Sequence, residues 1–481
     1  MSITTVDNFN SSVCSDANKI NKNGFAFVLN ENNKYSFIST TGVNDIRITL
    51  EKYKENQNEL FLLIEQDNNK DDDLILSVTS YIDSNQDRIY TAQTGNYIGK
   101  FKYQKIDINI KSRFSDIFLI RMLNFANDVF LDDVSLFDAL ENKTKDTNYS
   151  KFIIYYMFIQ KLEKAFLLGL PKSYVSVNYH EMKVKGKIDI NRFIKYDIPF
   201  KGKISSTSRE QKDIQEIIDV LYKAISIIDK QSKEDNVIST KNISHIKTHL
   251  KQHKSNKFVS NETISEAIKS KALQNPIFAP YKKVLEYAKL IINANNLEEK
   301  RDADKKTFGF LVNVAELFEI YLYKLLQKEF PDWEVVHEEP LEVYKSNFYS
   351  RHMYPDIVMK KDKDIMVFDA KYKKMNFTKG IGDGQIGDLD RSDFFQIHTY
   401  MSYYQNSNYK VKVGGLLYPM ESKYDKNKCY SESWFDNNNT KFIIDGIDLS
   451  PRDGEQEIMM EIIKDREDTF IKRIRELLGK D

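Results

Sequence analysis

Two short apolar runs with a charged segment between them restrict the fold of this chain more than any other stretch of its sequence. The first run covers residues 354–359 and the second covers residues 365–371, and both are rich in Ile, Val, Met and Phe. Apolar runs of this length and composition are typical of buried strands. The intervening residues 360–364 are all charged, so the two runs together predict a β-hairpin.

The predicted hairpin carries three charged residues that fit a metal site. Asp356 stands near the start of the first strand and Asp369 near the end of the second. Lys371 follows two residues later, and the alternation of side chains along a strand places it on the same face as Asp369. Two carboxylates beside an ammonium group favour a hard divalent cation with a lysine next to it.

This pattern, Pro-Asp followed by Asp-x-Lys, resembles the PD-(D/E)xK nuclease superfamily. Asp and Glu make up 71 of the 481 residues, so a carboxylate two positions before a lysine often arises by chance. A second Pro-Asp pair, Pro331-Asp332, has no such sequel close behind it. Asp356 and Asp369 both adjoin apolar runs, where an unpaired carboxylate is costly to bury. The context therefore favours a site over the alternative, a surface hairpin with ordinary salt bridges.

Charge and cysteine content exclude several classes of protein. Basic and acidic residues number 71 each, which gives a formal net charge of zero, so a nucleic-acid contact needs a local basic patch. Cys14 and Cys429 are too few for a disulfide framework or a cysteine zinc site. Residues 1–16 lack the features of a signal peptide, and no stretch is long and apolar enough to span a bilayer. We expect a cytoplasmic protein with no membrane contact.

The pattern along the whole chain predicts an α+β multidomain protein in three parts. Residues 1–112 contain short strand-like runs and are expected to form a β-rich N-terminal domain. Residues 113–304 are mainly helical, with one helix expected at 209–229, and residues 305–481 mix helices and strands as an α/β domain does. A long helix is expected at 308–330 and another at 392–404. The glycine-rich segment 379–388 lacks the Lys-Ser/Thr ending of a P-loop, so this chain is expected to bind no nucleotide.

Three further residues of the C-terminal part are candidates for the same site. Gln396 and Tyr400 lie four residues apart on a predicted helix and share one face of it. Gln396 is a candidate for contact with a phosphate or with the attacking water, and Tyr400 for contact with DNA. Glu319 lies on the predicted helix 308–330, from which it would add a metal ligand. For all three the alternative is an ordinary surface or packing residue.

The middle region holds the clearest basic patch, which includes Lys183, Lys185, Lys187 and Arg192. The functional interpretation is contact with DNA phosphates. A solvated, lysine-rich face is the alternative.

Several short segments occur in the order known from one protein family. They are residues 97–99, 108–114, 184–189 and 317–319, the Pro-Asp and Asp-x-Lys pairs, and residues 393–400. In this order they resemble the McrC-type endonuclease subunits of McrBC-like restriction systems.

The resemblance implies a C-terminal restriction-endonuclease-like domain of the PD-(D/E)xK type that cleaves DNA in anti-phage defence. Mg²⁺ (or Mn²⁺) would be held by Asp356, Asp369 and the Ala370 carbonyl, with Glu319 as a further ligand. Lys371 would orient or help to deprotonate the attacking water, with Gln396 beside it. The partners would be DNA and a McrB-like AAA+ GTPase or ATPase hexamer, which docks on the N-terminal domain.

Two other functions stay open at this point. The chain would be a non-catalytic adaptor if its nuclease fold were degenerate and served only to activate an AAA+ NTPase, but the intact Asp-Asp-Lys set argues against this. A nucleic-acid-binding module that uses the basic patch is the other alternative.

Overall fold

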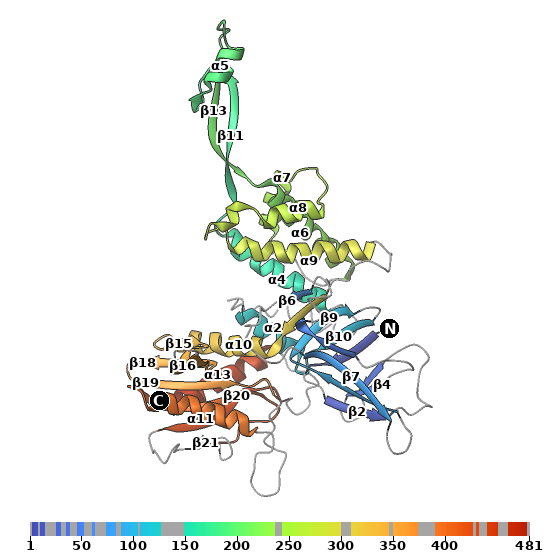
Figure 1. Ribbon diagram of the computed structural model, residues 1–481, viewed down its shortest axis with the longest axis vertical. Helices are drawn as coiled ribbons and strands as arrows, with labels where there is room; N and C mark the ends of the chain where they lie inside the picture. The colour runs from blue at the N-terminus through green and yellow to red at the C-terminus, as the bar shows by residue number, and fades with distance from the viewer. Residues whose placement is uncertain are drawn as a thin grey trace. The chain divides into compact units, whose positions relative to one another are not determined.

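The structure is a computed structural model that describes residues 2–7, 10–14, 26–29, 35–38, 46–51, 60–62, 74–82, 88–103, 106–126, 149–235, 243–299, 309–345, 350–373, 390–426, 430–431, 440–450 and 460–478. The chain separates into two compact units, one made of Met1–Phe137 with Lys306–Asp481 and the other of Asp138–Lys305. Both helices and several small sheets are present (Figure 1), which confirms a mixed α and β fold. The division at residues 112 and 304 stays a prediction.

The N-terminal segment of the first unit contributes most of three small sheets. One has the order β1-β10-β9-β14-β6, a second has the order β2-β8-β7-β5, and β3 pairs with β4. The strands are β1 (Ser2–Val6), β2 (Asn10–Cys14), β3 (Ala26–Leu29), β4 (Tyr35–Ile38), β5 (Ile46–Thr49), β6 (Leu60–Leu62), β7 (Leu74–Ile82), β8 (Arg88–Thr94), β9 (Tyr97–Tyr103), β10 (Ile106–Lys111) and β14 (Gly309–Asn313).

Strand β14 corrects the expected helix at 308–330. Its buried residues Leu311 and Val312 lie between β9 and β6, and a short apolar run does not by itself distinguish a strand from a helix. The helix α10 (Val314–Glu329) begins only after Asn313, whose side chain accepts hydrogen bonds from the backbone N–H groups of Ala315 and Glu316. This N-cap supplies acceptors for two otherwise unpaired donors and fixes the start of the helix.

The C-terminal segment forms a six-stranded mixed sheet with the order β15-β18-β19-β20-β22-β21. The pairs from β15 to β19 are antiparallel, those from β19 to β22 are parallel, and β21 is antiparallel to β22. The strands are β15 (Glu334–His337), β18 (Ile357–Lys361), β19 (Asp364–Ala370), β20 (Lys410–Met420), β21 (Tyr430–Ser431) and β22 (Lys441–Asp448). A separate hairpin consists of β16 (Leu341–Lys345) and β17 (Ser350–Met353).

Helix α11 (Arg391–Gln405) packs on the face of this sheet that displays Ile365 and Val367 of β19. Ile397, Met401 and other buried side chains of the helix fill that core. Because side chains alternate along a strand, the same face continues to Asp369. The helix and the predicted acidic site therefore lie on one side of the sheet.

A second contact within this unit joins helices distant in sequence. In α2 (Asp116–Ala126), Arg121 donates two hydrogen bonds, of 2.9 and 2.7 Å, to the carboxylate of Glu467 in α13 (Met460–Leu477). Tyr321 of α10 donates a third, of 2.6 Å, to the same carboxylate. All three side chains are buried, and both oxygens of the Glu467 carboxylate accept hydrogen bonds, as a buried charge requires.

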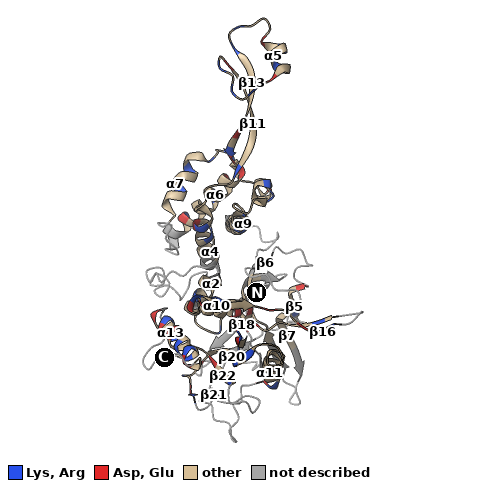
Figure 2. Ribbon diagram, turned by 90° about the vertical axis from the view of Figure 1, so that its left-hand side faces the viewer, with Lys and Arg blue, Asp and Glu red and all other residues tan. Residues whose placement is uncertain are grey.

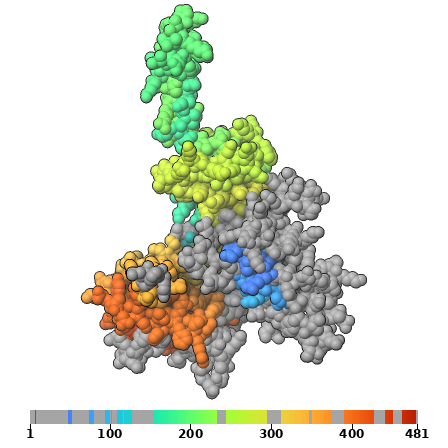
Figure 3. Space-filling view, viewed as in Figure 1, coloured from blue at the N-terminus to red at the C-terminus, as the bar shows by residue number. Residues whose placement is uncertain are grey.

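The second unit combines helices with an antiparallel ribbon. The helices are α4 (Tyr149–Phe166), α6 (Gln215–Asp235), α7 (Ser244–His253), α8 (Asn261–Ile268), the 3₁₀ helix η1 (Lys271–Gln274) and α9 (Pro280–Glu299). The ribbon consists of β11 (Lys172–Glu181) and β13 (Ile204–Asp213), and it extends away from the helices of its unit (Figure 3). At its far end lie β12 (Lys187–Ile188) and α5 (Ile190–Tyr196).

The helix expected at 209–229 is therefore wrong in its first part. Residues up to Asp213 pair with β11, and α6 begins at Gln215. Among the described helices, none has an apolar stretch long enough to cross a bilayer.

Candidate active site

The hairpin predicted from the two apolar runs is present as β18 and β19. The strands pair from Ile357 with Phe368 to Lys361 with Asp364. The turn between them places Asp362 at a φ of 57°, in the left-handed region. Aspartate tolerates this region better than most residues do, because its short side chain can bond locally.

The same register brings the two predicted carboxylates together. Continued by one residue, it sets Asp356 opposite Asp369. Asp369 is fully buried and Asp356 is nearly so. Asp356 Oδ2 accepts a hydrogen bond of 2.7 Å from the backbone N–H of Ala370, which ties the first acid to the strand that carries the second.

Asp369 is in an environment that disfavours its charge. Burial raises the pKa of this carboxyl to about 8, and the negative charge of Asp356 adds to the rise, although Lys371 opposes it. Within the described part of the chain, Asp369 Oδ1 accepts no hydrogen bond. A buried carboxylate oxygen that lacks a donor is a fitting ligand for a cation.

Lys371 lies on the same side as Asp369, as strand alternation predicts. Its Nζ is 2.6 Å from Asp369 Oδ2, and its side chain is mostly buried. Burial alone would lower the pKa of this ammonium, but the charges of Asp369 and Asp356 outweigh burial and raise the pKa. The lysine therefore remains a cation at neutral pH.

Gln396 and Tyr400 extend this group through a series of hydrogen bonds. Lys371 Nζ donates to Gln396 Oε1 at 3.0 Å, and Gln396 Nε2 donates to the Tyr400 hydroxyl at 2.8 Å. The hydroxyl then donates to the backbone carbonyl of Tyr354 at 3.1 Å. The two residues share a helix face as predicted. In this structure Gln396 contacts Lys371, so it fixes the position of the ammonium.

The segment that carries Lys371 is also held by its neighbours in the fold. The Lys371 backbone N–H donates to the Leu417 carbonyl at 2.8 Å. Lys373 Nζ lies 2.9 Å from Asp393 Oδ2 at the start of α11. These contacts connect the end of β19 both to strand β20 and to the helix that presents Gln396.

The donor set fits a hard divalent cation with few protein ligands. The described residues contain no group of three or more His, Cys, Asp and Glu that could hold a metal, so Asp356 and Asp369 would supply the side-chain ligands. Carboxylate, carbonyl and water oxygens are what Mg²⁺ prefers, and Mg²⁺ commonly keeps several waters. Glu319 is buried on α10, and its role as a metal ligand stays a prediction.

The predicted basic patch lies in the other unit, at the far end of the ribbon. The four residues of the patch lie between Glu181 and the end of α5, near the far end of the ribbon; they are Lys183, Lys185, Lys187 and Arg192. Figure 2 colours basic and acidic residues and shows this end of the ribbon. Sequence reasoning missed that the patch is mixed with exposed apolar side chains. We call residues 182–203 the ribbon end; its exposed apolar residues are Met182, Val184, Ile188, Ile190, Ile194, Tyr196, Ile198 and Phe200.

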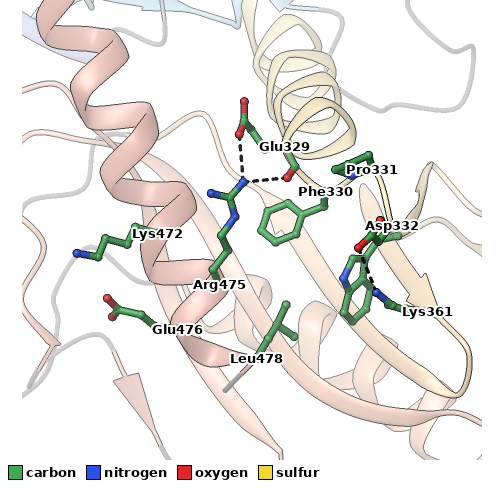
Figure 4. Close-up of a pocket in the computed structure, with 10 residues that line it drawn as sticks. Glu329, Phe330, Pro331, Asp332, Lys361, Lys472, Arg475, Glu476 and Leu478 are labelled. Atoms are coloured by element: carbon green, nitrogen blue, oxygen red, sulfur yellow. Dashed lines mark hydrogen bonds and ion pairs between the residues drawn. The ribbon is translucent and has the colours of Figure 1, made fainter. Parts of the chain in front are cut away.

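A cavity elsewhere in the first unit is lined by none of the candidate site residues. It has a volume of about 520 Å³ and lies between the C-terminal end of α10 and α13 (Figure 4). Two of its cations are paired, because Arg475 contacts Glu329 at 3.2 Å and Lys361 contacts Asp332 at 3.5 Å. Nothing in this cavity points to chemistry.

Comparison with known proteins gives the chain a family. The model of a family described as "McrBC 5-methylcytosine restriction system component" matches residues 92–419, well over half of the chain. This range includes Asp356, Asp369, Lys371 and Gln396. No curated protein matches the sequence.

Two solved structures from Thermococcus gammatolerans are similar. One is described as a half-complex of a tetradecameric assembly of McrB AAA+ hexamers with bound McrC. It has a TM-score of 0.53 at 15% identity, with 99% of this chain and 100% of that chain covered. The other, the McrBC complex, has a TM-score of 0.32 at 15% identity, with 69% and 88% covered, and is too dissimilar to inform the fold. The family match, together with the first of these folds, confirms the resemblance drawn from the sequence, and the chain belongs to the McrBC 5-methylcytosine restriction system component family, with a fold of the McrC type.

Proposed function

We propose that this chain is the metal-dependent endonuclease subunit of a McrBC-type restriction system and that its C-terminal sheet is a nuclease domain of the PD-(D/E)xK type. The observation that supports this most is the buried group of Asp356, Asp369 and Lys371 at one end of the β18–β19 hairpin. A purely structural hairpin gains nothing from two coupled carboxylates in an apolar core, because their burial costs free energy. Carboxyl groups whose pKa is strongly shifted by burial and by a neighbouring charge are typical of functional sites.

Asp356 and Asp369 would hold Mg²⁺ or Mn²⁺, with the backbone carbonyl of Ala370 as a third ligand. When bound, such an ion lowers the pKa of a coordinated water and stabilises the charge that develops on the leaving oxygen. The chain's own contribution is to keep two carboxylates close together in a dry place, where their attraction for a cation is strong.

Lys371 would orient the attacking water and offset negative charge on the phosphate. Its ammonium is kept charged by Asp369 and is held in place by Gln396 Oε1. A cation that is already oriented needs no reorganisation when negative charge develops, which is the basis of electrostatic catalysis. Gln396 and Tyr400 fix this orientation from α11.

The proposed partner is a McrB-like AAA+ GTPase or ATPase hexamer, in line with the assembly described for the Thermococcus gammatolerans proteins. The ribbon end supports a protein contact, because Met182, Ile190 and Phe200 are each more than 60% exposed. Apolar groups gathered on a surface mark protein contacts better than DNA contacts. Phosphate contact by the ribbon-end lysines is the alternative. Docking through the N-terminal domain stays a prediction.

The test is plasmid cleavage by the chain with its cognate AAA+ protein and GTP or ATP, in Mg²⁺ or in EDTA. We expect cleavage only with the metal, and none from Asp369→Asn or Lys371→Ala. The matched control is Asp332→Asn, because Asp332 also follows a proline but is exposed and contacts Lys361, at the opposite end of the β18–β19 hairpin from Asp356 and Asp369. It should cleave like the wild type.

Calorimetry gives a second readout that does not depend on the partner. Mn²⁺ at about 100 times its dissociation constant should stabilise the wild type by about 2.7 kcal/mol and raise its melting temperature, but should leave that of Asp369→Asn unchanged. Wild-type cleavage in EDTA would exclude a metal-dependent mechanism, and full activity of Asp369→Asn would show that the chain is instead a non-catalytic activator of the NTPase.

A further inference from the structure

A buried arginine of the N-terminal segment reaches the end of the strand that carries the candidate site. Arg113 follows β10 and is only 7% exposed at its side chain. Its guanidinium NH2 group donates to the backbone carbonyl of Tyr372, the residue after Lys371. The guanidinium also lies over the Tyr372 ring, 4.8 Å from its centre.

The guanidinium is itself fixed by a fully buried carboxylate. Arg113 Nε lies 3.3 Å from Asp7 Oδ2, and the Arg113 backbone N–H donates to Asp7 Oδ1 at 2.7 Å. Asp7 in turn donates its backbone N–H to the Lys111 carbonyl at 3.0 Å. The arginine is therefore attached to the edge of the N-terminal sheet, where β1 pairs with β10.

Aromatic packing surrounds the same point. The Phe114 ring meets the Tyr372 ring edge to face at 5.2 Å, and the Phe318 ring of α10 lies 5.7 Å from it. Tyr372 is buried. Together with the bond from the Lys371 backbone N–H to Leu417, these contacts hold the short segment after β19 from two sides.

We propose that Arg113 is a positioning residue for the candidate active site. It fixes the backbone of Tyr372, and through it the direction in which Lys371 leaves the strand toward Asp369 and Gln396. The inference rests on the proposed function, because it concerns the geometry of that site. It also makes the site depend on a segment 259 residues away in sequence.

The chemistry calls for arginine at this position. The planar guanidinium has donors on several nitrogens, so one group forms an ion pair with the Asp7 carboxylate and donates a hydrogen bond to the Tyr372 carbonyl while its face lies on a ring. Lysine would keep the charge for Asp7, but a single ammonium on a flexible stem would not hold both oxygens and the ring. Arg113→Lys therefore removes the positioning contact and keeps the buried charge balanced.

The experiment compares Arg113→Lys with Arg121→Lys in the full chain. Arg121 is a matched control because it is also buried and also joins the N-terminal segment to the C-terminal one, but its guanidinium bonds Glu467 of α13. Each variant is measured for its melting temperature, for Mn²⁺ binding, and for kcat and KM in plasmid cleavage with the AAA+ partner and nucleotide. If Arg113→Lys does not fold, Asp7→Asn, which frees the guanidinium, takes its place.

We expect both variants to melt earlier, but only Arg113→Lys to lose kcat, by about 10-fold to 100-fold with KM little changed, as a small displacement of a catalytic group does. Its Mn²⁺ affinity should also fall, because Ala370 and Tyr372 share the displaced segment. Equal kcat values for the two folded variants would overturn the positioning role and leave the proposed function intact. A wild type that neither cleaves nor binds Mn²⁺ would overturn both.

Discussion

Asp369, Lys371 and Gln396 illustrate how single residues at this site depend on one another. Burial raises the pKa of the Asp369 carboxyl, and the Lys371 ammonium lies beside it and offsets its negative charge. The Gln396 side-chain oxygen accepts a hydrogen bond from that ammonium and orients it. The spacing of Asp356, Asp369 and Lys371 made these three predictable, since a strand register and its alternation are local properties. Arg113 could not be predicted in this way, because its contact with Tyr372 depends on how distant segments pack.

The hydrogen bond from Lys371 to Gln396 gives a graded prediction. Gln396→Ala should lower kcat about tenfold, because a hydrogen bond to a charged group contributes about 1.5–3 kcal/mol. Tyr400→Phe should lower kcat less, since it keeps the ring in the core and removes only the hydroxyl that accepts a hydrogen bond from the Gln396 amide. Single-turnover cleavage rates measure both effects.

Thr399→Ala is the control for these two variants, because the Thr399 hydroxyl bonds only to the Phe395 carbonyl of its own helix among the described contacts. A Gln396→Ala protein as fast as Thr399→Ala would show that the amide does not position the lysine.

At the scale of elements, the sequence predicted best those that pair with their neighbours along the chain. The β18–β19 hairpin needs only its own two runs and a short turn, and helix α11 is close to its expected range of 392–404. Strand β14 was expected to be helical because its partners, β9 and β6, lie in the N-terminal segment. Strand β13 was missed in the same way, because its polar residues pair with β11. Tertiary pairing overrides local periodicity in both cases.

The central strand β20 offers a test of how closely the elements around the site are packed. A Cβ atom at Gly415 would lie 2.4 Å from the backbone carbonyl oxygen of Ile443 in β22. Gly415→Ala should therefore push the parallel strands apart and destabilise the fold by about 1–3 kcal/mol, the usual cost of overpacking. Thermal or denaturant unfolding measures this loss.

The neighbouring residue provides the matched comparison. The three heavy atoms nearest to a Cβ atom at Gly414 would all belong to the side chain of Met401, and a flexible thioether can move aside. Gly414→Ala should thus destabilise the fold less than Gly415→Ala does. If Gly414→Ala were the more destabilising of the two, the close approach of β20 to β22 would not be the reason for glycine at position 415.

At the scale of the whole molecule, the first unit is built from both ends of the chain. Strand β14 lies within a sheet of N-terminal strands, and Glu467 of α13 receives the buried Arg121. Composition and periodicity do not reveal such an assembly, because each half reads by itself as a plausible domain. The second unit differs in that its ribbon end carries exposed apolar groups and α5 buries no residue. That part contributes little to the stability of its own unit, which points to a role in contacts with other molecules.

Removal of the ribbon end tests this role. Residues 182–203 can be replaced by a short glycine-containing turn, because Glu181 and Ile204 are already paired across the ribbon. We expect the variant to keep its melting temperature and its Mn²⁺ binding, since no helix of the core is altered, and to lose association with the AAA+ hexamer by at least about tenfold, as expected when several apolar contacts at a protein interface are removed. Analytical ultracentrifugation of the mixed proteins measures the association.

Two sets of substitutions separate a protein contact from a DNA contact at the ribbon end. Ile190→Ser with Ile194→Ser removes apolar area on α5 and should weaken association with the hexamer. Changing Lys183, Lys185, Lys187 and Arg192 to alanine removes the cations that would contact phosphates and should mainly weaken salt-dependent DNA binding. Because the apolar side chains are the costly ones to leave in water, we expect the isoleucine pair to have the larger effect on assembly. A larger effect of the basic set on DNA binding, with assembly unchanged in both variants, would assign the ribbon end to DNA instead.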